Sequence, residues 1–311
     1  MSARVAAVDV GTNSVRLLVA EAAQPLLVVE REMRITRLGK GVDANGRLDD
    51  QALERTLACI DDYAERWQDL GAERVRVTAT SAIRDASDRD RFFAAVRERT
   101  GVEAEVLSGQ EEGCTAFVGA TSLVEGEPPY LVLDIGGGST EFILGDREPD
   151  AMTSRQLGCV RLSERALCSD PPTVGEVTEA RALVDAELDA VEALFDATSA
   201  RTLIGVAGTT TTIAALALDL PAYLPERIHG SRVSAERVRS ITDELCRLST
   251  AARAELGPMA PGREDVIHAG ALILDRVVDR FRFPGVLVSE ADILDGLVLG
   301  LLNEAPLRLC D

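Results

Sequence analysis

Two similar stretches of the sequence predict the fold: VAAVDVGTNS at residues 5–14 and YLVLDIGGGST at residues 130–140. Each stretch reads as an apolar strand, an aspartate, one more apolar residue and a turn rich in glycine and hydroxyl side chains. A second apolar run follows each turn, at residues 15–20 and 141–144. We therefore expect a strand, a tight turn and a second strand in each copy. One such hairpin would be ordinary, but two copies with the same Asp-x-Gly spacing favour a shared function.

The chemistry of these turns suits a phosphate ligand. Glycine lets backbone N–H groups converge on an anion because no Cβ blocks the approach, and serine and threonine hydroxyls add donors. An aspartate makes sense beside phosphate if it holds a water or Mg²⁺, which is usually bound by one or two carboxylates together with phosphate oxygens. Two such turns that face each other would hold one phosphate chain from both sides. The turn residues are Gly11, Thr12, Asn13 and Ser14 in the first copy and Gly137, Gly138 and Ser139 in the second.

Length and charge narrow the classes of protein to which this chain can belong. Its 311 residues allow about two domains, and no apolar run approaches the ~18 residues that span a bilayer. The net charge of −19 argues against nonspecific binding to nucleic acid or to a membrane surface. The sequence enters a strand almost at once, without a signal peptide, and its six cysteines form no Cys-x-x-Cys or Cys/His cluster. We therefore expect a cytoplasmic protein with reduced thiols.

The order of the expected elements is α/β, and it is repeated in the two halves of the chain. Ser87–Asp90 resembles a capping box at the start of a helix, and Thr173–Glu176 does so in the second half. A pair of prolines marks the boundary between the halves. We therefore expect an N-terminal domain at residues 1–124 and a C-terminal domain at residues 125–311.

Several polar positions have two interpretations each. Gly208 and Thr209 follow a strand and open a helix, which indicates either an anion site or an ordinary N-cap; as a third Gly/Thr turn they favour phosphate. Glu111 and Glu112 open another helix, where an acid either complements the helix dipole or acts as a general base. Arg84 lies just past a strand end and is either a ligand contact or a solvated side chain. Position alone does not choose between these interpretations.

Taken together, the motifs resemble a known family. The strings that carry the resemblance are DVGTNS at residues 9–14, SGQEEG at 108–113 and DIGGGSTE at 134–141, with further matches at residues 79–84, 158–162, 207–209 and 263–270. They are similar to the exopolyphosphatase/guanosine pentaphosphate phosphohydrolase (Ppx/GppA) family of the actin, Hsp70 and sugar-kinase superfamily. The resemblance implies an α/β, actin-like fold of two duplicated ribonuclease-H-like domains with an interdomain cleft.

The resemblance also implies roles for individual residues. Glu112 would be the base that activates water. Asp134 and Glu141 would hold Mg²⁺, or Mn²⁺ in its place, with Asp9 as a further candidate ligand on the opposite wall. Arg84 would grip the phosphate chain. The implied phosphate-binding residues are Gly11, Thr12, Asn13, Ser14, Arg84, Gly137, Gly138, Ser139, Gly208 and Thr209.

Four functions are compatible with these motifs. The first is a Mg²⁺-dependent exopolyphosphatase that removes terminal phosphate from inorganic polyphosphate by attack of water. The second is hydrolysis of guanosine pentaphosphate to guanosine tetraphosphate. An ATP-dependent kinase or ATPase of the same superfamily is a weaker alternative, because the SGQEE segment at residues 108–112 is a hydrolase feature by resemblance. A catalytically silent sensor of phosphate chains is also weaker, because Glu112, Asp134 and Glu141 are all present. The resemblance also implies a homodimer, without nucleic-acid or membrane partners.

Overall fold

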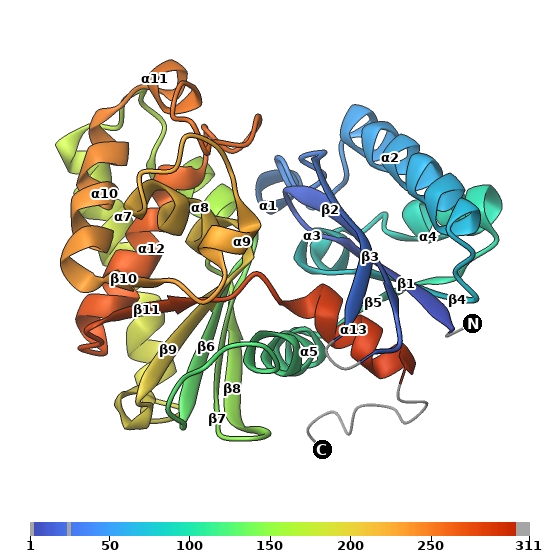
Figure 1. Ribbon diagram of the computed structural model, residues 1–311. Helices are drawn as coiled ribbons and strands as arrows, with labels where there is room; N and C mark the ends of the chain where they lie inside the picture. The colour runs from blue at the N-terminus through green and yellow to red at the C-terminus, as the bar shows by residue number, and fades with distance from the viewer. Residues whose placement is uncertain (1–2, 24–25, 303–311) are drawn as a thin grey trace. The chain divides into compact units, whose positions relative to one another are not determined.

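The computed structural model describes residues 3–23 and 26–302 (Figure 1). Its internal contacts divide the chain into two units, Met1–Gly119 with Ile293–Asp311 and Ala120–Asp292. The sequence predicted a boundary after residue 124, with all later residues in the second domain. The division differs because the last helix, α13 (Ile293–Leu302), packs on the sheet of the first unit. This helix is almost entirely apolar, so it needs a hydrophobic surface to cover it.

The first unit contains a five-stranded sheet in the order β3-β2-β1-β4-β5. Its strands are β1 (Arg4–Val10), β2 (Ser14–Glu21), β3 (Leu27–Ile35), β4 (Arg74–Ala79) and β5 (Ala104–Val106). Its helices are α1 (Val42–Asn45), α2 (Asp50–Asp69), α3 (Ser81–Asp85), α4 (Asp90–Thr100), most of α5 (Gly109–Thr121), and α13. The first three strands are antiparallel neighbours, whereas β4 and β5 run parallel to β1.

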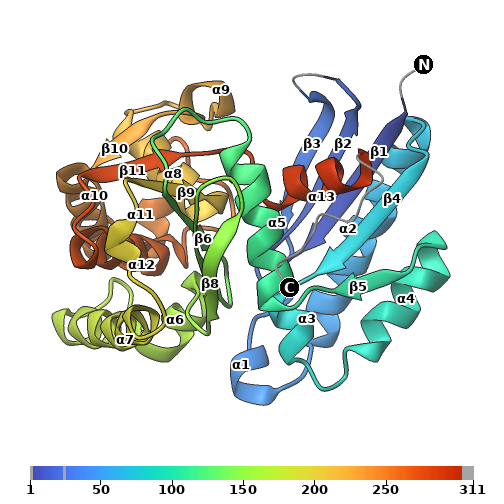
Figure 2. The same ribbon diagram turned by 90° about the horizontal axis from the view of Figure 1, so that it is seen from below.

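The two faces of this sheet belong to two different cores, because successive side chains of a strand point to opposite faces. Val8 of β1 packs in the core that includes α2 and α4, whereas its neighbour Ala7 packs in the core that includes α5 and α13. Figure 2 shows α13 beside β1 and β2, in agreement with their contacts. By the same alternation, Asp9 lies on the α5 and α13 face.

The second unit contains a six-stranded sheet in the order β10-β11-β9-β6-β7-β8. Its strands are β6 (Tyr130–Ile135), β7 (Thr140–Gly145), β8 (Pro149–Arg155), β9 (Thr202–Val206), β10 (Arg232–Ser234) and β11 (Gly285–Val288). Its helices are α6 (Cys159–Ala166), α7 (Val174–Glu192), α8 (Ala207–Ala217), α9 (Pro225–Ile228), α10 (Ala235–Arg247), α11 (Thr250–Ala254) and α12 (Ile267–Arg280), with a 3₁₀ turn, η1 (Ala197–Ser199).

The second sheet repeats the topology of the first. Strands β6, β7 and β8 form an antiparallel meander, and β9 and β11 continue the sheet parallel to β6. The short antiparallel strand β10 is an addition at the edge. The predicted duplication of an α/β unit is confirmed. The cleft that the resemblance implies between the units stays a prediction.

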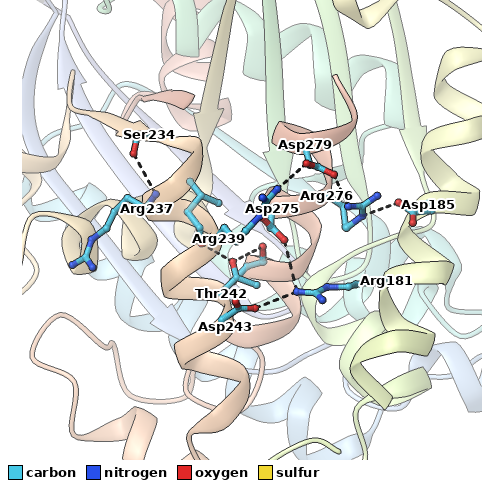
Figure 3. Close-up of polar contacts among 12 residues, drawn as sticks. Arg181, Asp185, Ser234, Arg237, Arg239, Thr242, Asp243, Asp275, Arg276 and Asp279 are labelled. Carbon is cyan, nitrogen blue, oxygen red and sulfur yellow. Dashed lines mark hydrogen bonds and ion pairs between the residues drawn. The ribbon is translucent and has the colours of Figure 1, made fainter. Parts of the chain in front are cut away.

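Ion pairs hold three helices of the second unit together around a buried carboxylate (Figure 3). Asp275 of α12 is 4% exposed and lies 3.5 Å from Arg239 of α10 and 3.9 Å from Arg181 of α7. Burial raises the pKa of Asp275, and the nearby arginines oppose that shift. One turn along α12, Asp279 accepts a hydrogen bond of 2.7 Å from Arg239. The network is structural, since it joins the helices that pack behind the sheet.

Of the two capping boxes that the sequence predicted, one is confirmed and the other is wrong. Thr173 and Glu176 form the expected capping box at α7. The box expected at Ser87–Asp90 is wrong: α4 begins after Arg89 without a side-chain cap, and Asp88 instead accepts a hydrogen bond from the Leu48 N–H. Strands β3 and β10 were not anticipated, because edge strands with mixed charge lack a clear apolar alternation.

Two broader expectations can be compared with the described part of the chain. Among residues 3–23 and 26–302, none of the helices has the length and apolarity needed to cross a bilayer. Cys59, Cys159, Cys168 and Cys246 are free thiols. Cys114 is disulfide-bonded, so the expectation that all cysteines are reduced is wrong at this position.

Candidate active site

The first hairpin places an ion pair beside its turn. The Gly11 N–H donates to the Ser14 carbonyl at 2.9 Å and closes the turn between β1 and β2. Asp9 is 4% exposed, and the residue directly opposite it on β2 is Arg16. Arg16 donates from Nε and Nη2 to Asp9 Oδ2 at 3.1 and 2.7 Å. The guanidinium therefore balances the charge of this buried carboxylate.

The backbone of the first turn is oriented by hydrogen bonds to its carbonyls. The Asn13 carbonyl accepts from the N–H groups of Thr36 and Arg37, and the Thr12 carbonyl accepts from Gly39. The N–H groups of Thr12 and Asn13 donate to no partner among residues 3–23 and 26–302. Adjacent free N–H groups in a tight turn are the donors that an anion needs.

Arg84 and Glu112 meet at the same edge of the first sheet. Strands β1, β4 and β5 are parallel, and α3 and α5 follow the carboxyl ends of β4 and β5. Arg84 Nη1 donates to the Leu107 carbonyl at 2.9 Å and to Glu112 Oε2 at 3.1 Å. Glu112 is 8% exposed. The second guanidinium nitrogen, Arg84 Nη2, is buried and has no hydrogen-bond partner within the described residues.

The structure distinguishes the two neighbouring glutamates. Glu111 accepts a hydrogen bond of 2.8 Å from the Ser108 N–H, and its own N–H donates to Ser108 Oγ at 3.1 Å. This is a capping box, so the Glu111 carboxylate is engaged at the start of α5. Glu112 makes no part of the cap and pairs with Arg84 instead. The helix-dipole interpretation therefore fits Glu111, and the catalytic interpretation fits Glu112.

The second hairpin places two carboxylates opposite each other. The Gly136 N–H donates to the Ser139 carbonyl at 3.0 Å, as in the first turn. Asp134 and Glu141 are direct cross-strand partners, which places their Cβ atoms about 4.5–5.5 Å apart on one face of the sheet. They are 6% and 1% exposed. Ser154 of the next strand donates to Glu141 Oε1 at 2.6 Å and orients it.

This pair has the donor chemistry of a magnesium site. Buried carboxylates that face each other repel unless a cation or a proton lies with them. No group of three or more His, Cys, Asp or Glu side chains that could hold a metal ion occurs in the described residues. Mg²⁺ needs no such group, since it is commonly held by one or two carboxylates, water and substrate phosphate. Asp134 and Glu141 therefore fit a metal that is shared with a phosphate ligand.

The start of α6 holds the second turn from behind. The N–H groups of Cys159, Val160 and Arg161 donate to the carbonyls of Gly136 and Gly137 at 2.9–3.1 Å, and Arg161 Nε donates to the Gly138 carbonyl at 2.7 Å. A Cβ on Gly158 would lie 2.3 Å from the Gly137 carbonyl oxygen, so only glycine allows this approach.

The carbonyl groups of the second turn thus accept hydrogen bonds, whereas its N–H groups donate none within the described residues. The N–H groups of Gly137, Gly138 and Ser139 have no hydrogen-bond partner in the part of the chain that the structure describes. Three consecutive free N–H groups form an anion-binding concavity. Each unit therefore contains one such cradle beside an acidic strand end.

Gly208 and Thr209 lie at the strand end next to Asp134. Val206 of β9 is the parallel partner of Asp134, and α8 begins at the following residue. The Gly208 carbonyl accepts hydrogen bonds from Arg263 Nη1 and from Thr212 Oγ1. A Cβ on Gly208 would lie 2.0 Å from the Arg263 guanidinium. A side chain at position 208 would therefore have to displace the Arg263 guanidinium, and the first turn of α8 remains an available anion site.

The structure groups the residues predicted for the site into three sets. The first unit holds Asp9, Gly11, Thr12, Asn13 and Ser14 on one hairpin, and Arg84 with Glu112 at the neighbouring strand ends. The second unit holds Asp134, Gly137, Gly138, Ser139 and Glu141 on the other hairpin, with Gly208 and Thr209 beside it.

Three residues that support these sets were assigned no role from the sequence. Arg16 lies just after the motif at residues 9–14 that carried the family resemblance, and it occupies the position equivalent to Glu141, which a comparison of the two hairpin registers would have revealed. Gly158 and Arg263 lie in segments that carried the family resemblance, but nothing in the sequence indicated that they pack on the turns. Such contacts arise only when distant segments fold together.

Comparison with known proteins identifies the family. The pattern of the Ppx/GppA phosphatase family matches residues 17–305. The chain belongs to this family. It is 45% identical over 313 residues to a protein named exopolyphosphatase 2 from Mycobacterium tuberculosis, covering 96% of this chain and 98% of that one.

Solved structures of this family share the architecture. An exopolyphosphatase-like protein with 37% identity matches with a TM-score of 0.94 over 97% of this chain and 99% of its own. A family member from Aquifex aeolicus with 31% identity matches with a TM-score of 0.82 over 98% and 99% of the two chains. The Ppx/GppA fold therefore covers nearly the whole chain.

Proposed function

We propose that this protein is an exopolyphosphatase that hydrolyses the terminal phosphoanhydride bond of inorganic polyphosphate. One observation carries the proposal: both units present a turn with free N–H donors beside a buried aspartate at a strand end. Each cradle taken by itself suits a phosphate of a repeating chain, because it binds an anion without needing a specific base or sugar. The family membership and the 45% identical exopolyphosphatase support this substrate class.

Glu112 is the proposed general base. Its carboxylate takes a proton from water as the water oxygen bonds to the terminal phosphorus, and the bridging P–O bond breaks toward the remaining chain. Arg84 orients Glu112 through the 3.1 Å contact, and its unpaired Nη2 supplies a donor for a phosphate oxygen.

Asp134 and Glu141 are the proposed ligands of Mg²⁺, with Mn²⁺ as an alternative, because they face each other and are buried. The metal, when bound, neutralises charge that develops on the phosphate oxygens. Asp9 is the weaker candidate, since Arg16 already balances its charge. Gly137, Gly138 and Ser139 orient the phosphate through their N–H groups.

The remaining expectations stay predictions of this proposal. Guanosine pentaphosphate is the alternative substrate, because the family name joins the two activities. We also expect a homodimer and a cytoplasmic location, with no nucleic-acid or membrane partner. These follow from family resemblance and from the net charge of −19.

The test is release of orthophosphate from polyphosphate, guanosine pentaphosphate and ATP, each measured with Mg²⁺ and with excess EDTA. We expect Mg²⁺-dependent release that is fastest from polyphosphate. Faster release from guanosine pentaphosphate would establish the alternative substrate. Release from ATP alone would indicate an ATPase, and no release from any of the three would contradict an enzymatic role.

A further inference from the structure

One charged segment that the proposed function does not use lies against the first turn. Residues 36–41 connect β3 to α1, and three backbone hydrogen bonds tie this connection to the turn. Thr36 and Arg37 donate to the Asn13 carbonyl at 3.0 and 2.9 Å, and Gly39 donates to the Thr12 carbonyl at 2.8 Å. The connection therefore has a fixed position relative to the cradle.

Packing makes this connection rigid. Leu38 is completely buried in the core that includes α2 and α4. A Cβ on Gly39 would lie 2.1 Å from Thr12 Cγ2, so the connection packs closely against the side chain of the turn. Arg37 has φ 57°, a left-handed conformation that costs about 1–3 kcal/mol for a residue with a side chain. Such strain persists only where the surroundings impose the backbone conformation.

The next residue on this connection is Lys40, the only lysine among the 33 basic residues of the chain. Its side chain is exposed and makes no hydrogen bond or ion pair with any residue that the structure describes. In contrast, most arginines that the structure describes in the first unit form ion pairs with carboxylates, as Arg4, Arg66 and Arg99 do. The protein has a net charge of −19, and the Lys40 ammonium has no partner within the described residues although it lies beside an anion cradle. The simplest explanation is that Lys40 binds a ligand.

We propose that Lys40 is a phosphate-binding residue that contacts a phosphate of the polyphosphate chain other than the one released. The proposal rests on the proposed function, because it takes the first turn as a substrate cradle. The ammonium group attracts a second phosphate while the N–H groups of Thr12 and Asn13 hold the first. Lys40 contributes to substrate affinity and takes no part in the chemical step.

Because the sequence contains one lysine, NMR can observe binding at Lys40 directly. Protein grown with ¹³C,¹⁵N-labelled lysine has one side-chain signal, which belongs to Lys40 without further assignment. Imidotriphosphate, whose P–N–P bridges resist hydrolysis, is added in the presence of Mg²⁺ while calorimetry measures its affinity. We expect the Lys40 Cε and Nζ signals to shift with a midpoint equal to the calorimetric Kd. Binding of the analogue with no movement of these signals would overturn the proposal.

Kinetics provide the second measurement. Lys40→Gln should raise KM for polyphosphate by about 5-fold or more with kcat unchanged, as expected for loss of one charge-assisted contact. Lys40→Arg should restore most of the affinity. The matched control is Arg97→Gln, which removes one exposed positive charge from α4 of the same unit. An equal rise of KM in the control would show only a general charge effect and would overturn the assignment.

The two proposals can fail separately. If the wild-type protein released no phosphate from polyphosphate, the proposed function would fail, while the shift of the Lys40 signals would still decide whether the residue binds phosphate chains. If the protein is active but Lys40→Gln leaves KM unchanged, only the Lys40 proposal fails. A rise of KM for guanosine pentaphosphate without one for polyphosphate would overturn the assignment to the inorganic chain.

Discussion

The hairpins of the two units share one register but differ in the residue opposite the aspartate. Asp9 faces Arg16 in the first hairpin, whereas Asp134 faces Glu141 in the second. The first pair joins a carboxylate and a guanidinium, and the second joins two carboxylates in a buried position. Duplication therefore conserved the backbone cradle, while the side chain opposite the aspartate differs between the units.

The same comparison applies to the elements that hold the two turns. Residues 36–39 hold the carbonyls of the first turn, and the start of α6 holds those of the second. Each of these segments directly follows the third strand of its antiparallel meander, and both have the same effect, which is to occupy the carbonyls and leave the N–H groups for an anion. This shared feature is what the duplicated sequence encodes.

The largest expected effect tests whether the first unit supplies the base. Glu112→Gln should lower kcat by about 10²-fold or more and leave substrate binding intact, because a positioned base is removed while the shape of the side chain is kept. Glu111→Gln is the matched control and should affect the rate much less, since Glu111 caps α5. Initial rates and the affinity for a non-hydrolysable analogue give the measurement. Equal losses in both variants would contradict the assignment.

The second prediction concerns which hairpin binds the metal. Asp134→Asn should raise the Mg²⁺ concentration needed for half-maximal activity by about tenfold or more, because a direct ligand is weakened. Asp9→Asn should shift it less, since Arg16 already balances Asp9. Activity is measured over a Mg²⁺ titration. Full activity of the wild type in excess EDTA, or the reverse order of the two variants, would refute the comparison.

The third prediction compares the free energy of unfolding of variants in the two hairpins. Arg16→Gln leaves the buried Asp9 carboxylate without its cation and should destabilise the protein by about 2–3 kcal/mol, less than a fully buried pair would because Arg16 is partly exposed. Glu141→Gln keeps an acceptor for the Ser154 hydroxyl and removes a carboxylate that faces another carboxylate, so it should cost less metal-free stability than Arg16→Gln. Urea denaturation in EDTA compares the two. A larger loss for Glu141→Gln would show that the second pair is already neutral.

The fourth prediction compares the supports of the two turns. Gly158→Ala places a methyl group 2.3 Å from a backbone carbonyl, which cannot move without distorting the turn. Gly39→Ala meets the Thr12 side chain, which can change its rotamer. Each should reduce stability and activity, by about 1–3 kcal/mol in stability for Gly158→Ala and less for Gly39→Ala. Thermal melting and initial rates distinguish them, and equal effects would argue against rigid support of the second turn.

The smallest expected effect concerns the capping box at the start of α7. Hydrogen bonds from the Thr173 backbone and neighbouring groups lower the pKa of Glu176 to about 2. Its contribution to stability is therefore present above pH 4.5 and is lost as the pH falls toward 2. Melting temperatures of the wild type and Glu176→Gln should differ most above pH 5 and converge near pH 2. A difference that stays constant with pH would mean that the carboxylate charge does not stabilise the cap.

The sequence by itself determined the duplicated hairpins, the α/β order and the candidate residues. Strand alternation, glycine turns and the spacing of Asp9 and Asp134 are local features, so they can be read without a structure. The capping box at Thr173 was predictable for the same reason, because its partners are three residues apart. The choice between Glu111 and Glu112 was not, since both occupy the same first turn.

Only the tertiary structure decided which groups those residues meet. It paired Glu112 with Arg84 and placed Lys40 beside the first turn, and it returned α13 to the first unit. The physical reason is that these contacts join segments far apart in the sequence, where burial and hydrogen-bond geometry select the partners. Local sequence specifies a turn that can bind phosphate and the side chain opposite its aspartate, whereas long-range packing specifies the groups that hold the turn in place.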